Sequence, residues 1–335
     1  MTIALSPDDA RELALNALLA VGVPTWEAQV TANALIAAER DGLASHGLSR
    51  LPFYLEQALT GKIVADARAE TSVKGAVIRV DAGHGLAFPA VARGLDQAIP
   101  LARELGVVAV AIGRSHHFGV AGHPVERLAR EGLVSMAFSN APSAMAPWGG
   151  HTPLFGTNPI AFASPRQNSE PLVIDLSLSK VARGKVMLAK KAGQPIPEGW
   201  ALDTQGQPTT DPDAAIAGSM IPAGDSKGAA LALMVELLTA GLSGGNFGFQ
   251  AGSFFEAQGE PPGVAHLILV FDPDHFGAHY LAHVESLFQT MLSQEGVRLP
   301  GQRRYAMRAS SAENIELPSA LVEALSAYAT QKRSS

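Results

Sequence analysis

One short segment of the chain brings together side chains able to move a proton and to hold a carboxylate. Ser45, His46 and Arg50 fall within six residues of one another. The imidazole of histidine has the ordinary pKa best placed for proton transfer near neutral pH, and the Ser45 hydroxyl is placed to orient that ring. Arginine is the side chain best shaped to hold a carboxylate by paired hydrogen bonds. Taken alone, however, the segment favours a capping histidine and a surface ion-pair arginine.

A second segment, residues 113–123, follows an apolar strand and contains three glycines and three histidines. A glycine-rich strand-to-helix loop with free N–H groups suits a phosphate. The histidines, His116, His117 and His123, also suggest a metal site, and with it a metal-dependent hydrolase. Their spacing includes no carboxylate and no second cluster follows, so a phosphate loop ranks above a metal. A polar turn before a helix at Pro124 competes with both interpretations.

Three further segments carry groups suited to anions or to helix caps. Asp175-Leu176-Ser177 stands at a strand end, where ligands of open α/β sheets bind and where a helix N-cap would also stand. Ser226 and Lys227 open a helix, and a bound anion would offset the misplaced lysine there. Arg298 to Arg304 surround a Pro-Gly turn in an otherwise acidic chain. Recognition of a ribose phosphate competes there with a solvated basic loop.

Common nucleotide-binding and catalytic motifs are missing from the sequence. It has no G-x-G-x-x-G turn after a strand, no G-x-x-x-x-G-K-[ST] loop and no G-x-S-x-G elbow. Any dinucleotide must therefore bind in an unusual fold. The chain contains 0 cysteines, which excludes disulfides, thiolate metal sites, iron–sulfur clusters and a cysteine nucleophile.

The bulk composition is that of a globular protein without the excess of positive charge that would attract a polyanion. Of the 335 residues, 47% are hydrophobic and 17% charged, and the formal net charge is −6. A weakly acidic surface predicts no binding to nucleic acid or to a membrane. No apolar run is long enough to span a bilayer, and Ser6-Pro7-Asp8-Asp9 is typical of a helix start rather than a secretion signal. We therefore expect a cytoplasmic location.

The elements that must position these residues are read from hydrophobic periodicity. Helices are expected first, over Pro7–Val21, Thr25–Asp41 and Leu51–Leu59. Strands and helices then alternate, which predicts an α/β domain with a largely buried sheet. Its expected strands are Val73–Val80, Val107–Ile112, Leu133–Phe138, Ile160–Ala163, Leu172–Asp175 and Ala265–Phe271, with helices over Leu86–Leu105 and Pro124–Arg130.

The second half of the chain adds a loop and three helices to this prediction. Lys191–Gly218 is expected to be a long ordered loop. The helix Gly228–Leu242 is apolar nearly all round and is expected to be buried. Helices over His275–Glu295 and Ser319–Gln331 end the chain.

Taken in order, these segments resemble the malate/L-lactate dehydrogenase family that lacks the Rossmann fold. The resemblance runs from residues 41–50 through Pro147-Trp148-Gly149-Gly150, Gly156-Thr157-Asn158-Pro159 and Lys227-Gly228 to Leu299-Pro300-Gly301. It implies a homodimer and a non-Rossmann NAD(P)-binding α/β domain with a mixed, largely buried sheet. It also implies two domains, with residues 73–274 binding the cofactor and residues 1–72 with 275–335 forming a helical, substrate-side domain.

The same resemblance assigns roles to residues. His46 resembles the family's proton donor, Ser45 its orienting hydroxyl, Arg50 the clamp on the substrate carboxylate and Thr157 a further substrate contact. The implied cofactor is NADPH, with NADH as the alternative, and Arg303 and Arg304 are expected to meet the 2′-phosphate. The expected cofactor contacts are His117, Phe118, Gly119, Val120, Ala121, Asp175, Leu176, Ser177, Ser226, Lys227, Arg298, Gly301, Arg303 and Arg304. No metal is expected.

Within the family, residues 181–185, 199–203 and 228–238 look most like the Δ1-piperideine-2-carboxylate/Δ1-pyrroline-2-carboxylate reductases. The expected function is therefore reduction of a cyclic imino acid to L-proline or L-pipecolate, with His46 giving the proton. The alternative is a 2-hydroxy acid dehydrogenase of the malate, L-lactate, ureidoglycolate or sulfolactate type. One position departs from the reductases: their Gly-Asp pair, whose Asp completes a relay with Ser and His, is Gly184-Lys185 here. Either another acid such as Asp175 orients His46, or the subgroup differs.

A third possibility is a non-enzymatic nucleotide- or imino-acid-binding protein that has kept the fold. The presence of both His46 and Arg50 argues against it, because a decayed member would be expected to lose one of them.

Overall fold

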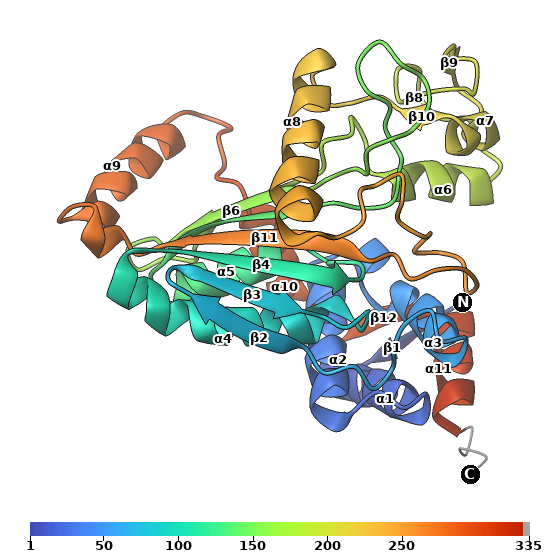
Figure 1. Cartoon of the computed structure of the whole chain (residues 1–335), viewed down its shortest axis with the longest axis horizontal. Helices are drawn as coiled ribbons and strands as arrows, with labels where there is room; N and C mark the ends of the chain where they lie inside the picture. Colours follow the sequence, from blue (N-terminus) through green and yellow to red (C-terminus); the bar gives the residue numbers. More distant parts are fainter. Residues whose placement is uncertain (331–335) are drawn as a thin grey trace.

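A computed structural model describes residues 1–330 of the chain, and its centre is a seven-stranded mixed sheet (Figure 1). The strands follow the order β2-β3-β4-β11-β5-β6-β7, and only β3 and β4 are parallel neighbours. The predicted mixed α/β fold is confirmed. The strand bounds are β2 Glu70–Lys74, β3 Val77–Asp81, β4 Val107–Ser115, β5 Val134–Ser139, β6 Ile160–Ser164, β7 Leu172–Leu176 and β11 Val264–Phe271.

Helices cover the two faces of this sheet. On one face, α4 (Ala87–Leu105) and α5 (Gly122–Arg130) pack through small and branched side chains such as Ala98 and Val125 against the central strands. On the other face lie α8 (Ser226–Glu236) and the π-helical turn η3 (Leu237–Gly241) that continues it. The sheet is buried on both faces because each carries its own apolar cluster.

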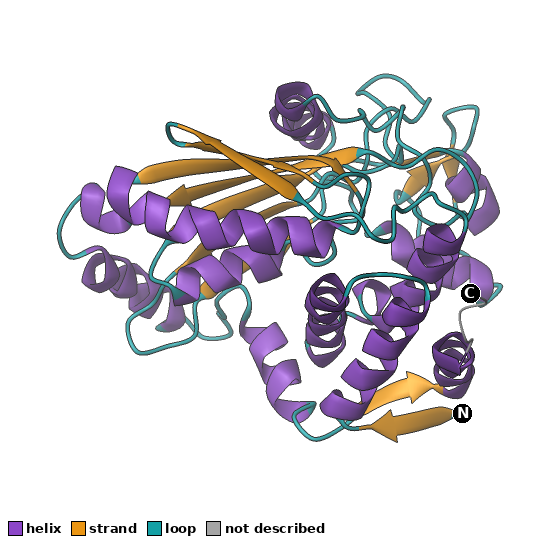
Figure 2. Cartoon of the chain, turned by 60° about the horizontal axis from the view of Figure 1, so that its bottom comes forward, coloured by secondary structure: helices purple, strands orange, loops and turns teal. Residues whose placement is uncertain are grey.

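The prediction that the helix Gly228–Leu242 is buried is wrong. Leu231, Leu237 and Leu242 are 41%, 55% and 67% exposed, whereas Ala232 and Val235 are fully buried. The helix packs on the sheet along one side only, so the leucines on its other side stay partly exposed. In Figures 1 and 2, α8 lies at the edge of the molecule.

Two other segments are folded differently from the prediction. Residues 73–80 do not form one strand, because Gly75 with a φ of 56° turns the chain between β2 and β3. The predicted loop Lys191–Gly218 contains β8 (Ala201–Leu202), β9 (Pro208–Thr209) and α7 (Pro212–Ala217). Its strands join β10 (Ser219–Met220) in a three-stranded sheet, and α6 (Arg183–Lys191) comes before it.

A helical cluster packs beside the large sheet. It consists of α1 (Pro7–Ala20), α2 (Thr25–Arg40), α3 (Leu51–Leu59) and α11 (Ser319–Thr330), around a separate apolar core. The antiparallel pair of β1 (Thr2–Leu5) and β12 (Ile315–Pro318) holds the two ends of the chain together (Figure 2). The predicted helix Ser319–Gln331 is found to its described end, and residues 331–335 lie outside the described residues.

The other C-terminal helices pack elsewhere. α9 (Tyr280–Leu292) meets β7 through Phe288, Leu172 and Leu299. α10 (Gln302–Ser310) lies between α2 and α5, to which Arg308 binds it. The division of the chain into two domains remains a prediction. Among residues 1–330, no helix is both long and apolar enough to cross a membrane.

Candidate functional site

The segment that carries His46 is folded into two 3-10 turns directly after α2. The first spans Ala44–His46 and the second Leu48–Arg50. Glu39 at the end of α2 accepts a hydrogen bond of 2.7 Å from the backbone N–H of Leu48. A Cβ on Gly47 would lie 2.3 Å from that carboxyl, so a larger residue there would displace the Glu39 side chain. Burial raises the pKa of Glu39 to about 7.

His46 lies beside a hydroxyl and is held neutral by its surroundings. Its Nδ1 is 3.0 Å from Ser45 Oγ, as expected of an orienting hydroxyl. Burial lowers the pKa of His46 to about 4, the charge of Arg50 adds to this, and Asp175 opposes it. A neutral imidazole at pH 7 is able to accept a proton from a substrate hydroxyl.

Arg50 is positioned with part of its guanidinium free. Its Nε donates to the carbonyl of Ser45 at 2.8 Å, and its guanidinium lies 4.5 Å from the ring centroid of Phe255. Its Nη1 is buried without a hydrogen-bond partner within residues 1–330. A buried donor left unpaired is costly unless a ligand satisfies it. A carboxylate is a group that could satisfy this donor.

The three histidines of residues 113–123 bind separate partners. His117 Nδ1 is 2.6 Å from Tyr54 Oη, His116 Nε2 is 2.7 Å from Gln57 Oε1, and His123 Nε2 is 2.9 Å from Asp41. The described part of the chain holds no group of three or more metal-ligating side chains. The ring of His117, an expected cofactor contact, lies 5.5 Å from that of His46.

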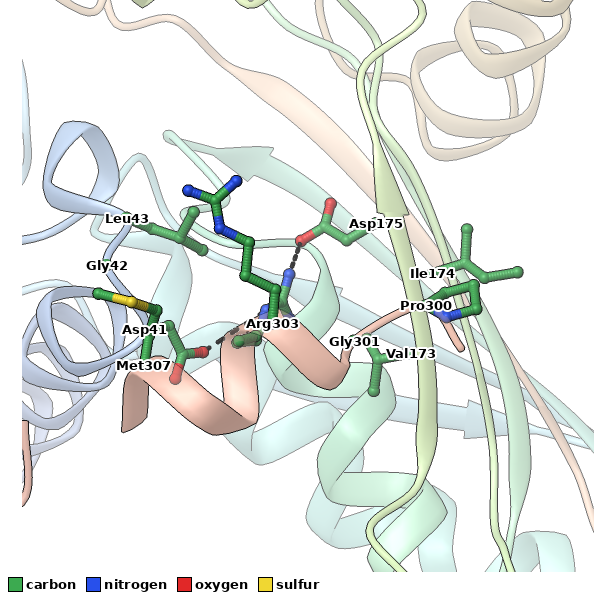
Figure 3. Close-up of a pocket in the computed structure, with 11 residues that line it drawn as sticks. Asp41, Gly42, Leu43, Val173, Ile174, Asp175, Pro300, Gly301, Arg303 and Met307 are labelled. Carbon is green, nitrogen blue, oxygen red and sulfur yellow. Dashed lines mark hydrogen bonds and ion pairs between the residues drawn. The ribbon is translucent and has the colours of Figure 1, made fainter. Parts of the chain in front are cut away.

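A pocket of about 450 Å³ opens next to this centre, between the end of α2, strand β7 and helix α10 (Figure 3). Its walls are apolar at Leu43, Val173 and Met307. Asp175 accepts hydrogen bonds of 2.9 Å from the backbone of Gly122 and from Arg304, and Arg304 also pairs with Asp41 at 3.6 Å. In Figure 3, Arg303 extends past Leu43 and takes part in none of the marked interactions.

The chemistry of the pocket lining is compatible with part of a dinucleotide. Arg303 is a cation without a carboxylate partner within residues 1–330, and the buried Nη1 of Arg304 has no hydrogen-bond partner there either. Gly301 has a φ of 90°, and a Cβ on it would lie 3.2 Å from the carbonyl of Val173. Cationic groups, a close-lying glycine and apolar walls suit a ring that carries a phosphate.

Several expected cofactor residues lie elsewhere. The side chains of Phe118, Val120 and Ala121 are buried, and Phe118 stacks on His266 at 4.4 Å, so these side chains are not free to meet a ligand. Gly119 has a φ of 75° and contacts the Phe88 ring. The remaining expected residues outside the pocket lining are the exposed Ser226, Lys227, Arg298 and Leu176, and the half-buried Ser177.

Thr157 is also half-buried, and its carbonyl accepts a hydrogen bond from the N–H of Leu178. This bond links the Gly-Thr-Asn-Pro turn to the segment after β7.

Sequence reasoning missed three residues that shape the site. Tyr54 lies four residues after Arg50, a spacing that puts both on one helical face and would have suggested their proximity. Glu39 and Phe255 gave no comparable signal, because the first acts through the backbone of Leu48 and the second reaches Arg50 from far along the chain.

Comparisons with known proteins agree with this geometry. The model of the malate/L-lactate dehydrogenase family matches residues 5–326. The (2R)-3-sulfolactate dehydrogenase (NADP(+)) of Chromohalobacter salexigens is 74% identical, over 99% of this chain and 100% of its own. The Δ1-pyrroline-2-carboxylate/Δ1-piperideine-2-carboxylate reductase of Pseudomonas aeruginosa is 40% identical, over 95% and 97%. The crystal structure of the Δ1-piperideine-2-carboxylate reductase of Pseudomonas syringae superposes with a TM-score of 0.92 at 38% identity, over 98% and 100%.

Proposed function

Because the chain belongs to the malate/L-lactate dehydrogenase family of oxidoreductases, we propose that it oxidises (2R)-3-sulfolactate to 3-sulfopyruvate with NADP+, and catalyses the reverse reduction. The observation that carries this proposal is the 74% identity to a sulfolactate dehydrogenase, against 40% to a cyclic imino acid reductase. The alternative of a 2-hydroxy acid dehydrogenase is thus favoured over the expected imino acid reductase. Lys185 agrees with this change, since it replaces the acid of the reductase relay.

In the proposed oxidation the substrate loses a proton from its hydroxyl and a hydride from C2. Neutral His46 accepts the proton, and the Ser45 hydroxyl holds the imidazole in the orientation that faces the substrate hydroxyl. Arg50 binds the carboxylate through the part of its guanidinium that is free, which fixes C2 relative to His46. Bound NADP+ supplies the hydride acceptor at its nicotinamide ring. In the reverse direction, protonated His46 returns the proton to the forming alkoxide.

For the cofactor, Arg303 is the proposed contact to the 2′-phosphate that distinguishes NADP+ from NAD+. Arg304, expected to share this role, is bound to Asp175 and Asp41 and instead holds the pocket wall in place. Gly301 and Asp175 line the same pocket and complete the proposed contact set there.

Two broader expectations remain proposals of ours. The homodimer is supported by the exposed apolar face of α8 and η3, and the cytoplasmic location by the acidic composition.

The proposed function is tested by steady-state kinetics on the purified chain. NADP+ reduction is measured with (2R)-3-sulfolactate, L-malate and L-lactate, and NADPH oxidation with Δ1-pyrroline-2-carboxylate. We expect the highest kcat/KM with sulfolactate. A higher kcat/KM with the cyclic imine would overturn the proposal and restore the imino acid reductase.

A further inference from the structure

Three basic residues belong to the two segments that meet at Ser45. Arg50 contacts it directly through the Ser45 carbonyl. A Cβ on Gly184 would lie 3.7 Å from the Ser45 Cβ, so the first turn of α6 packs against Ser45. That turn also carries Arg183 and Lys185. Within residues 1–330, none of the three cations forms an ion pair with a carboxylate.

The two cations of α6 are held in different ways. Arg183 is half-buried, and its Nη1 donates a hydrogen bond of 3.0 Å to the carbonyl of Ser143. Lys185 is exposed, next in the chain to the glycine that meets Ser45. The four-carbon stem of a lysine lets its ammonium reach over a neighbouring surface without moving the backbone. Arg183 therefore holds its charge in a fixed position, whereas the ammonium of Lys185 is able to change position.

This arrangement is unfavourable in the free protein. The N-terminus of a helix carries partial positive charge, and α6 places two cations in its first turn with neither an acidic residue nor a side-chain cap. Arg50 adds a third positive charge, and Asp175, the acid that acts on His46, is already bound by Arg304 and Gly122. The buried Nη1 of Arg50 has no hydrogen-bond partner within residues 1–330, which leaves a donor available to a ligand at this place.

We propose that Lys185, supported by the fixed charge of Arg183, binds the sulfonate of the substrate while Arg50 binds its carboxylate. The inference rests on the proposed function and deepens it. Arg50 on one segment and the cations at the start of α6 on the other match an acid with an anion at each end of a three-carbon chain. A cyclic imino acid carries one carboxylate and an apolar ring, which leaves nothing for Lys185 to bind.

The test compares Lys185→Met and Lys185→Asp with the wild type, with (2R)-3-sulfolactate and L-lactate as substrates and saturating NADP+. L-Lactate has a methyl group where sulfolactate has its sulfonate-bearing carbon. We expect Lys185→Met to raise the KM for sulfolactate about 10-fold with little change in kcat, because the contact is made equally in the ground and transition states. Lys185→Asp raises it further through repulsion. The KM for L-lactate stays within about twofold of wild type.

Two controls separate this contact from a structural effect. Lys191→Met removes a lysine near the other end of α6 and should leave both KM values unchanged. Raising the ionic strength should increase the KM for sulfolactate in the wild type more than in Lys185→Met, because salt screens the contact that the variant lacks.

The results distinguish the two proposals. An unchanged KM for sulfolactate in Lys185→Met, or an equal rise for L-lactate, overturns the sulfonate contact while the proposed function stands. A wild type that does not oxidise sulfolactate overturns both.

Discussion

His46, the proposed base, lies in an environment that resists its protonation. Its imidazole is half-buried near Arg50, and desolvation and the Arg50 charge together outweigh the nearby Asp175 in setting its pKa. A group with a lowered pKa remains neutral, and so remains a base, to a lower pH than an ordinary histidine.

The first prediction concerns the pH dependence of the oxidation. Because the pKa of His46 is lowered to about 4, kcat/KM for the hydroxy acid should stay level as pH falls from about 8 to 6 and decline only near pH 4. His46→Asn should lower kcat by about 10²- to 10⁴-fold, whereas His151→Asn, an exposed control, should not. A decline centred at pH 6.5 or higher would show that His46 is not the base in this form.

The second prediction concerns the choice of cofactor. Arg303→Ala should raise the KM for NADP+ about 10-fold and leave that for NAD+ unchanged, because only NADP+ carries the 2′-phosphate. Arg68→Ala, which alters an exposed arginine outside the pocket lining, is the matched control. Equal effects of Arg303→Ala on both cofactors would place the phosphate elsewhere.

At the scale of elements, α10 is joined to α2 and α5 by a buried charge network. Arg308 donates to Asp41 at 2.7 and 2.9 Å and to Glu126 at 2.6 and 2.9 Å. The two carboxylate side chains are 0% and 6% exposed. Although burial opposes it, hydrogen bonds from His123 and Arg308 lower the pKa of Asp41. The network fixes the end of α2, from which the His46 segment departs.

The third prediction follows from this network. Arg308→Gln leaves two buried carboxylates poorly paired and should lower the free energy of unfolding by about 3 kcal/mol. Arg103→Gln breaks an exposed pair with Glu131 and should cost less than about 1 kcal/mol. Urea unfolding followed by circular dichroism measures both. Similar values for the two variants would mean that the buried pairs add nothing beyond surface ones.

At the scale of the whole molecule, the outer side of α8 and η3 forms an apolar face. Its exposed members are Leu231, Leu233, Met234, Leu237 and Leu242. A contiguous row of exposed leucines is unusual on a monomer and typical of an interface between proteins. The proposed homodimer would bury this face.

The fourth prediction tests that assignment by light scattering after gel filtration. The wild type should have the mass of a dimer, and Leu237→Asp should shift it toward the monomer by placing a charge in the apolar contact. Leu188→Asp, which alters a leucine 67% exposed on α6, is the control. A monomeric wild type, or a dimeric Leu237→Asp, would remove α8 from the interface.

Sequence by itself determined the family and most of the elements. The helix Leu51–Leu59 has the predicted bounds, and α1, α2 and α4 differ from their predicted bounds by one residue, because their periodicity and end signals are local. The order of motifs along the chain identified the malate/L-lactate dehydrogenase family, which the family model confirms. It also named Ser45 and His46 as neighbours able to act together, since adjacent residues need no tertiary structure to meet.

Only the tertiary structure decided which side chains remain free. Arg303 and Arg304 are indistinguishable in sequence, yet Arg304 is bound to Asp175 and Asp41, which come from β7 and the end of α2. Lys185 is far along the chain from Ser45, and packing of α6 brings its turn there. Gly228–Leu242 looked buried because its composition is apolar all round, but the sheet presents one face to it. Pairing and burial depend on contacts distant in sequence, which local patterns do not contain.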